Sequence, residues 1–176
     1  SSDLSTSELF FENCTIPADH LLGEVGSGLK QTLAQVSTGR ILIGILGLGI
    51  LQGSLERSVK YMSERTAFGK QLNQFQSLQF KVADMATNAH AARLMLYDAA
   101  LAKDEGRPND LQASMAKLFA TEKAMEAAHQ AVQIHGGNGI MTEYPVSRAF
   151  GDAKVLEIVE GTSEIQRMII SRTILR

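Results

Sequence analysis

The run that decides the fold class is ILIGILGLGIL, which occupies residues 41–51. It is too short to cross a lipid bilayer, so we interpret it as the buried face of a helix rather than as a membrane span. We expect this first long helix to run from near Gly28 to about Arg65. Glycines disfavour a helix interior, so their presence here indicates very close packing against this backbone; they are Gly44, Gly47, Gly49 and Gly53.

Helical spacing continues through the rest of the chain. A second helix is predicted from one apolar face and from the stop signal EGRP at 105–108; the face consists of Leu78, Val82, Met85, Ala89, Ala92 and Leu96. A third has Asn109 as N-cap with Gln112 three residues on, and ends at GGNG, 136–139. Its apolar stripe consists of Leu111, Met115, Leu118, Met125, Ala128 and Val132. Pro145 begins a shorter helix, and Thr162 with Ser163 begins the last one.

The segment before these helices has the composition of a strand. Residues 8–16, ELFFENCTI, are rich in aromatic and β-branched residues and stop at Pro17. A lone strand has no hydrogen-bonding partner, so we expect its sheet to lie outside this chain. The predicted fold is all-α: an antiparallel four-helix bundle with short appended helices, preceded by one short strand left over from a β-domain. Residues 1–24 would end that β-domain and form a linker, and 25–176 would form the bundle.

Composition excludes several function classes. The chain has 176 residues, of which 44% are hydrophobic and 20% charged, so it can build a core. A net charge of −2 provides no electrostatic surface for nucleic acid or an anionic membrane, and we expect neither nucleic-acid binding nor membrane insertion. The single cysteine, Cys14, cannot form an internal disulfide, which favours a reducing compartment.

Two motifs that could carry chemistry are read as structural, and a third is absent. Glu126 and His129 form an E-x-x-H pair, but a di-metal site needs a second such pair, and none of the other histidines has a glutamate three residues before it. We therefore predict no metal site. No G-x-S-x-G nucleophile motif is present. The glycines at 136–139 follow a helix, whereas phosphate loops precede one, so by themselves they favour a C-cap turn.

Four segments taken together resemble the acyl-CoA dehydrogenase family along essentially the whole chain. They are TSELFFENCTIPADHLLGEVGSG at 6–28, RTAFGKQLNQFQSLQF at 65–80 followed by KVADM, QIHGGNGIMTEYP at 133–145, and DAKVLEIVEGTSEIQR at 152–167. The first is similar to the junction between that family's β-domain and its C-terminal helical domain. One departure is Val159, where the family usually has tyrosine; it implies altered packing beside the acyl chain but retains the base that follows.

The resemblance gives Glu160 a role as catalytic base. In this family a glutamate at the matching position removes the α-proton of an acyl-CoA thioester while the β-hydrogen leaves as hydride to flavin N5, which yields the trans-2-enoyl-CoA. The apolar lead-in at Ile158 and Val159 fits this role, because desolvation disfavours a charged carboxylate and makes it a stronger base. Gly161 would let the backbone approach the thioester and stabilise the developing enolate oxygen. Without the resemblance, Glu160 would be read as the residue that ends a helix.

Two residues of the first helix are implied to lie near the substrate. Other members of the family carry the base on this helix, just before an arginine; here that position is Gly39, so Glu160 is the only candidate. Arg40 matches the arginine near the base and the thioester, and Ser37 lies one turn earlier on the same face.

The resemblance implies FAD as the cofactor. The residues matching contacts with its adenosine and pyrophosphate end, made from a neighbouring subunit, are Arg65, Phe68, Gln76, Gln133, Ile134, Gly136 and Gly137. Gln76 could instead close a capping box with Asn73. Thr162 and Glu164 match contacts on the flavin side, although Ser163 with Gln166 also reads as a plain N-cap.

The implied whole protein is a short-chain type of acyl-CoA dehydrogenase of fatty acid β-oxidation, with an acyl-CoA substrate and electron-transfer flavoprotein as its acceptor. It would lie in the cytoplasm of a bacterium or the mitochondrial matrix of a eukaryote. By itself the chain should be inactive, because the β-domain that holds the flavin is outside it. We expect a homo-oligomer, a dimer or tetramer, in which Gly44, Gly47 and Gly49 admit close packing. The alternative is a non-enzymatic helical module that only oligomerises.

Overall fold

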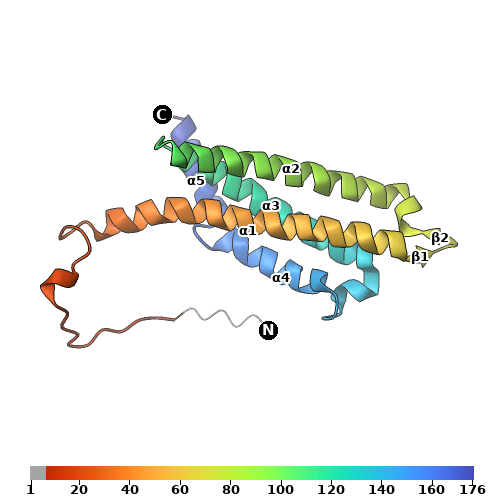
Figure 1. The fold of residues 1–176 in the computed structure, drawn as a ribbon, viewed down its shortest axis with the longest axis horizontal. Helices are drawn as coiled ribbons and strands as arrows, with labels where there is room; N and C mark the ends of the chain where they lie inside the picture. The colour runs from red at the N-terminus through yellow and green to blue at the C-terminus, as the bar shows by residue number, and fades with distance from the viewer. Residues whose placement is uncertain (1–6) are drawn as a thin grey trace.

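The computed structural model describes residues 7–176, and five helices make up most of it (Figure 1). They are α1 (Gly28–Glu64), α2 (Gln76–Asp104), α3 (Asp110–His135), α4 (Pro145–Ile158) and α5 (Ser163–Ile174). Helix α2 runs antiparallel to α1 and to α3, which run in the same direction; α4 packs against α1 and α3, and α5 packs against α3 (Figure 1). The predicted all-α fold, an antiparallel four-helix bundle with short appended helices, is confirmed, and the predicted helix ends lie within a few residues of the observed ones.

Short elements connect the helices. The 3-10 helices are η1 (Ala18–His20), η2 (Leu72–Gln74) and η3 (Gly136–Ile140). Between α1 and α2, strands β1 (Thr66–Ala67) and β2 (Lys70–Gln71) form an antiparallel hairpin at one end of the bundle (Figure 1). Its two turn residues, Phe68 and Gly69, have φ angles of +50° and +80°, the left-handed pair that a tight hairpin turn requires. Sequence patterning did not predict this hairpin.

The strand predicted at 8–16 is not formed. Residues 7–16 have no regular secondary structure, and the first six positions of the predicted segment 1–24 lie outside the described residues. The described residues offer this segment no strand to pair with, and an extended segment without a partner gains no ladder hydrogen bonds. Its apolar side chains are exposed, among them Leu9, Phe10 and Phe11. The segment therefore runs beside the bundle rather than forming part of it (Figure 1).

Helix α3 lies at the centre and is buried mainly through small residues. Its fully buried positions include Ala113, Ala116, Ala120, Ala124, Ala128 and Ala131. The predicted apolar stripe was wrong for its larger members, because Leu111, Met115, Leu118, Met125 and Val132 are only half-buried. The other four helices all contact α3, and small side chains let them approach its backbone closely. On α2 the predicted face is largely correct, since Met85, Ala89, Ala92 and Leu96 are buried.

Two glycines of α1 serve this close packing within the chain. A methyl group at Gly47 would lie 3.1 Å from the backbone of Ala120, and one at Gly44 would lie 2.6 Å from the side chain of Leu96. The prediction that these two glycines admit a second subunit is therefore corrected: they admit α3 and α2 of the same chain. Gly49, by contrast, is exposed, and a methyl group there would meet nothing within 4 Å.

By length and composition alone, α1 could cross a membrane. That criterion is weak evidence, because the core helices of soluble proteins also satisfy it. In this structure α1 packs lengthwise against α2 and α3 (Figure 1). Its central turns also carry a half-buried arginine, Arg40, and the buried Ser54 and Ser58, which suit a bundle helix.

Candidate active site

The loop between α4 and α5 makes a sharp turn at Glu160 and Gly161. Their φ angles are +54° and +92°, so two successive residues are left-handed. Glycine adopts this conformation freely, whereas for a residue with a side chain it costs about 1–2 kcal/mol. Strained backbone of this kind occurs preferentially at functional sites. The turn that the sequence motif singled out is therefore also unusual in its geometry.

Two buried side chains hold the turn. Gln166 of α5 donates from Nε2 to the carbonyl oxygens of Glu160 and Gly161, at 3.2 and 2.8 Å. Lys117 of α3 donates from Nζ to the carbonyl oxygen of Gly161 at 2.9 Å. Both side chains are fully buried. The strained conformation is thus fixed from two different helices, while the Glu160 residue itself is exposed.

The side chain of Glu160 lies against α1 at Gly39. A methyl group at Gly39 would be 2.6 Å from Glu160 Oε2 and 2.8 Å from its Cδ, which is closer than any ordinary contact. The absence of a side chain at position 39 thus leaves the space that the carboxylate occupies. The sequence had identified Gly39 only as a position without a base, and the structure adds that it accommodates the side chain of Glu160, the predicted base.

Arg40 and Ser37 face the beginning of α3. The Arg40 guanidinium forms an ion pair with Asp110, with 3.1 Å between Nη1 and Oδ1, and Ser37 donates to the Asn109 side chain at 3.5 Å. Asn109 therefore contacts α1 and does not cap α3 with its side chain. Arg40 Nε is buried and has no partner among the described residues. Arg40 therefore lies next to the contact between Gly39 and Glu160, and its Nε–H group has no acceptor among the described residues.

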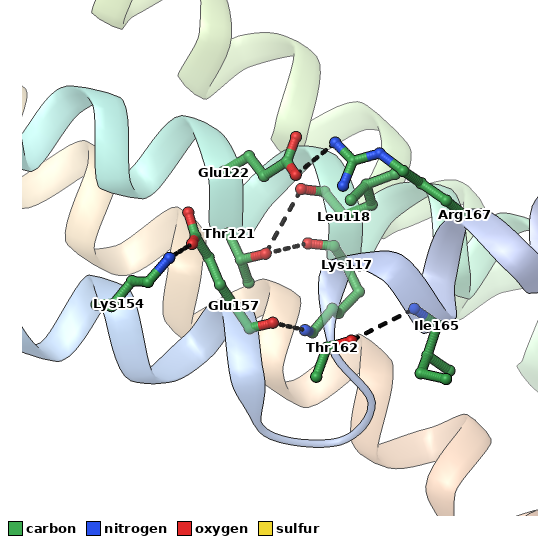
Figure 2. A network of polar contacts seen from close by, with 9 residues as sticks. All are labelled: Lys117, Leu118, Thr121, Glu122, Lys154, Glu157, Thr162, Ile165 and Arg167. Carbon is green, nitrogen blue, oxygen red and sulfur yellow. Dashed lines mark hydrogen bonds and ion pairs between the residues drawn. The ribbon is translucent and has the colours of Figure 1, made fainter.

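Thr162 and Glu164 form the start of α5. The N-cap is Thr162 rather than Ser163, since the Thr162 hydroxyl accepts from the backbone N–H of Ile165 at 3.4 Å. Hydrogen bonds to its own backbone N–H and to the Thr162 hydroxyl lower the pKa of the exposed Glu164 carboxyl. Figure 2 shows Thr162 and Ile165 beside the end of α4. Both predicted flavin-side residues therefore lie within four residues of Glu160.

A second group of predicted residues gathers at the other end of α1. Arg65, Gly136 and Gly137 line a cavity of about 360 Å³, and the remaining lining residues are Tyr61, Leu72, Ile134, His135 and Asn138. Two further predicted residues are exposed: Gln133, next to Ile134 at the end of α3, and Gln76, at the start of α2. The capping box suggested for Gln76 with Asn73 is not formed, because α2 has Phe75 as its N-cap and makes no side-chain cap there.

This cavity has the chemistry of a phosphate site. Arg65 makes no ion pair with any residue in 7–176, so its guanidinium is available for an anion. Gly136 has a φ of +58°, and a methyl group at either Gly136 or Gly137 would meet nothing within 4 Å, so their backbone is open to a ligand. The residues present therefore fit the diphosphate of FAD. Ile134 is buried in the core and can only support the loop.

Phe68 is the most exposed aromatic residue described. It is 95% exposed at the tip of the hairpin, and its only aromatic neighbour within the described chain is Phe75, with ring centroids 6.4 Å apart. Its ring is therefore free to contact a bound molecule. Figure 1 shows the hairpin at the end of the bundle where α1 ends, and Arg65 directly follows α1.

Tyr61 and His135 also line the cavity, and no sequence pattern singled them out. Their rings stack with centroids 4.2 Å apart, and Asn138 donates to the Tyr61 hydroxyl at 3.0 Å. His135 is buried, with Nδ1 2.8 Å from the carbonyl oxygen of Ala131. Burial lowers the pKa of His135, and the backbone hydrogen bond only partly opposes this. The ring is therefore neutral near pH 7, and among the residues that line the cavity the positive charge belongs to Arg65.

The two groups are too far apart to serve one flavin within this chain. Gly39 and Arg65 are separated by 26 residues of helix. At 1.5 Å per residue this amounts to about 39 Å along the axis, which is longer than an extended FAD molecule. The predicted cofactor residues therefore divide into a flavin-side set, at 162–164, and an adenosine-side set at the far end of α1.

No metal centre is found among the residues that the structure describes. Nowhere in 7–176 do three histidine, cysteine, aspartate or glutamate side chains come together. Glu126 of the E-x-x-H pair forms an ion pair with Lys123 at 2.6 Å, and the His129 ring lies 6.3 Å from that of Phe150. Glu126 and His129 both lie on α3, and their contacts are with Lys123 of the same helix and Phe150 of α4.

Comparison with known proteins gives a consistent result. Residues 26–175 match the family described as "Acyl-CoA dehydrogenase, C-terminal domain". The chain is 48% identical over 172 residues to the mitochondrial short-chain specific acyl-CoA dehydrogenase of Mus musculus, covering 98% of this chain and 42% of that protein.

Solved structures agree with this. Butyryl-CoA dehydrogenase from Megasphaera elsdenii matches with a TM-score of 0.90 and 43% identity, over 92% of this chain and 42% of that one. A chain solved in a study of the electron transferring flavoprotein of Acidaminococcus fermentans matches with a TM-score of 0.93 and 45% identity, over 94% and 44%. The chain thus spans less than half the length of these relatives.

Proposed function

The chain belongs to the acyl-CoA dehydrogenase family, whose C-terminal domain it forms, and we propose on that basis that the whole protein converts acyl-CoA thioesters to trans-2-enoyl-CoA. Glu160 takes a proton from the α-carbon, and the hydrogen on the β-carbon leaves with its electron pair as a hydride. FAD, when bound, supplies the acceptor for that hydride. One proton and one hydride thus leave the substrate, and a carbon–carbon double bond remains.

The observation that carries this proposal is the placement of Glu160. Its backbone is held in a left-handed turn by Lys117 and Gln166, and its carboxylate lies against Gly39, the position where other family members carry the base. A base so constrained loses little conformational freedom when it reacts, which is the main advantage of a preorganised group. The residue is exposed in this chain, as a group that meets a substrate must be.

Arg40 and Gly161 are assigned to the substrate. Arg40 lies one residue from the Gly39–Glu160 contact and keeps a buried Nε donor without a partner, which suits an anionic or carbonyl group of the CoA thioester. Gly161, without a side chain, lets the thioester come close to the backbone, where N–H groups favour the enolate oxygen. Ser37 is oriented by Asn109 on the same side of α1 and is assigned to the same region.

FAD binding is proposed to need two subunits. The proposed flavin-side residues Thr162 and Glu164 follow Glu160, whose side chain lies against Gly39. The proposed adenosine-side residues lie around Arg65, about 39 Å from Gly39 along α1 at 1.5 Å per residue. One chain therefore contributes to two different flavins, and a homodimer, or a tetramer made of two dimers, is the arrangement that this separation supports. The exposed Phe68 would then be covered by the cofactor or by the neighbouring subunit.

The substrate and partner follow from the relatives. The similarity to a short-chain specific enzyme and to butyryl-CoA dehydrogenase favours a short acyl chain. Electron-transfer flavoprotein is proposed as the acceptor, which the likeness to a chain from an electron transferring flavoprotein study supports. A single cysteine agrees with a reducing compartment, the cytoplasm of a bacterium or the mitochondrial matrix of a eukaryote.

The test is anaerobic reduction of the flavin in the whole protein. The purified protein is expected to be yellow, and acyl-CoA thioesters of increasing chain length should bleach it, most rapidly at short chain length. A free acyl-CoA without an α-hydrogen, such as pivaloyl-CoA, is the matched control and should leave the colour unchanged. Protein that binds FAD but is bleached by no acyl-CoA contradicts the proposal, and protein without FAD favours the alternative of a non-enzymatic assembly module.

A further inference from the structure

Lys117 has no assigned role, yet it is the largest side chain that the described structure buries completely. It lies in the middle of α3, and its Nζ donates to the carbonyl oxygen of Gly161 at 2.9 Å and to that of Glu157 at 3.4 Å. Figure 2 shows the ammonium group reaching the end of α4. Glu157 lies in the last turn of α4, and Gly161 follows Glu160, so Lys117 joins the two sides of the turn that presents Glu160.

The ammonium group is not part of an ion pair. Four carboxylates act on its charge: Glu157 of α4, Glu122 of α3, Glu160 of the turn and Glu164 of α5. Glu157 is paired with Lys154, and Glu122 is paired with Arg167 (Figure 2). The hydrogen bonds of Lys117 therefore go to backbone carbonyls, and its charge is not neutralised by direct contact.

Packing alone does not require a cation here. Burial lowers the pKa of Lys117, although the nearby carboxylates oppose this, so the charged form is disfavoured at this position. An unbranched apolar side chain such as methionine would fill a similar volume, and replacing a buried charge by an apolar residue of the same size is often neutral or stabilising. What the lysine supplies and methionine does not is a group that donates to both carbonyls at once.

We propose that Lys117 is a positioning residue for the catalytic base: it clamps the turn around Glu160 and places a positive charge beside it. This inference rests on the proposed function. Lys117 does not itself meet the substrate, since its Nζ is enclosed by the backbone of 157–161. It acts by keeping Glu160 in the left-handed conformation from which the carboxylate lies over Gly39.

The experiment uses the whole flavoprotein and three variants. Lys117→Met removes the donors and the charge at similar volume, and Lys117→Arg keeps both but places the donors differently. The matched control is Thr121→Val, one turn further along α3. Thr121 is also fully buried, but its hydroxyl donates only within its own helix, to the carbonyl oxygens of Lys117 and Leu118 (Figure 2).

In Lys117→Met the rate of anaerobic flavin reduction by butyryl-CoA should fall about 10- to 100-fold, the effect expected for a misplaced reacting group. Flavin content and the dissociation constant for acyl-CoA should stay within about threefold. Lys117→Arg should be faster than Lys117→Met, and Thr121→Val should match wild type.

A wild-type rate in Lys117→Met, or a rate lost only together with flavin content or acyl-CoA affinity, overturns the inference. Should Lys117→Met not fold with flavin, Lys117→Arg decides: a slower reduction at unchanged acyl-CoA affinity supports the inference, and any other result overturns it. Wild-type protein that no acyl-CoA reduces overturns the proposed function and this inference with it. Active wild type with an unaffected Lys117→Met overturns this inference alone.

Discussion

The carboxylate of Glu160 occupies the space that a side chain at Gly39 would need, since a methyl group there would lie 2.6 Å from Oε2. The two residues belong to different elements, the loop after α4 and the middle of α1, and are distant in sequence. One empty position on a helix therefore determines where the proposed base can lie.

Gly39→Ala should separate stability from activity. Alanine stabilises a helix interior by about 1 kcal/mol relative to glycine, and the flexible end of Glu160 can move aside. We therefore expect the free energy of unfolding to be unchanged or higher, while flavin reduction slows about tenfold or more because the base is displaced. Gly151→Ala in α4 is the control: the position is exposed, and with nothing within 4 Å it should gain stability and keep the wild-type rate. Equal rates in the two variants would contradict the role of Gly39.

Glu160→Gln should retain FAD and abolish reduction by acyl-CoA. The amide has the same shape as the carboxylate and can occupy the same left-handed turn, but it cannot accept the α-proton. The measurement is stopped-flow absorbance of the flavin under anaerobic conditions. Glu126→Gln, an exposed glutamate on α3 remote from the turn in sequence, is the control and should react normally. Bleaching of the Glu160 variant at a near-wild-type rate would show that another group is the base.

The stability of the protein should depend on pH partly through His135. Burial lowers its pKa in the folded state below the usual value of 6.5, so the unfolded chain binds the proton more readily. The contribution of His135 is thus present above pH 6.5 and is lost as the pH falls through the folded-state pKa. His135→Phe, which keeps a ring against Tyr61, should reduce the fall in thermal midpoint between about pH 7 and pH 5. An identical pH dependence in both proteins would exclude this role.

The 176-residue chain alone should not dehydrogenate acyl-CoA, even with added FAD. The residues proposed for the flavin lie near Gly39, those proposed for the adenosine lie beyond the C-terminal end of α1, and Glu160 is exposed, so we do not expect the chain to enclose a flavin by itself. The assay is enoyl-CoA formation with an artificial electron acceptor. The whole protein serves as the positive control, and turnover by the isolated chain above the level without protein would sink the claim.

The isolated chain should self-associate through α1. The exposed apolar side chains Leu42, Ile45 and Leu46 lie on this helix, and a groove between α1 and α4 continues their surface past Gly49. Apolar surface of this kind favours association with a second copy. Light scattering at micromolar concentration should give a mass of two or four chains, and the double variant Ile45→Lys and Leu46→Lys should lower it. A mass of one chain, unchanged on concentrating, would leave the prediction without support.

The helices were predicted well because the residues that begin or end a helix act on the backbone of their own segment. Pro145 begins α4 and EGRP ends α2 through the backbone of those residues alone, whatever packs around them. The segment 8–16 failed for the opposite reason, since a strand exists only when another strand pairs with it. The face of α3 was assigned by side-chain size, but a helix surrounded on all sides buries its small residues where the neighbouring backbones come closest.

The candidate site was found through a motif rather than through periodicity. Glu160, Gly161 and Thr162 are contiguous, so a sequence match can identify them together. Lys117 could not be found in this way, because a lysine between Ala116 and Leu118 reads as a solvent-facing position of a helix. Only the tertiary arrangement shows that it is buried and that its partners are carbonyl oxygens, which carry no side-chain signal at all.

The uninterrupted length of α1 restricts how this family member can change. Because Gly39 and Arg65 lie on one rigid helix, inserting or deleting a single residue between them would shift one end by about 1.5 Å and rotate it by about 100° relative to the other. The helix region around Gly39 and the region around Arg65 could then not both keep their present contacts. Length variation should therefore be confined to the connections between helices, such as 105–109 and 159–162, and α1 should accept substitutions but no change of register.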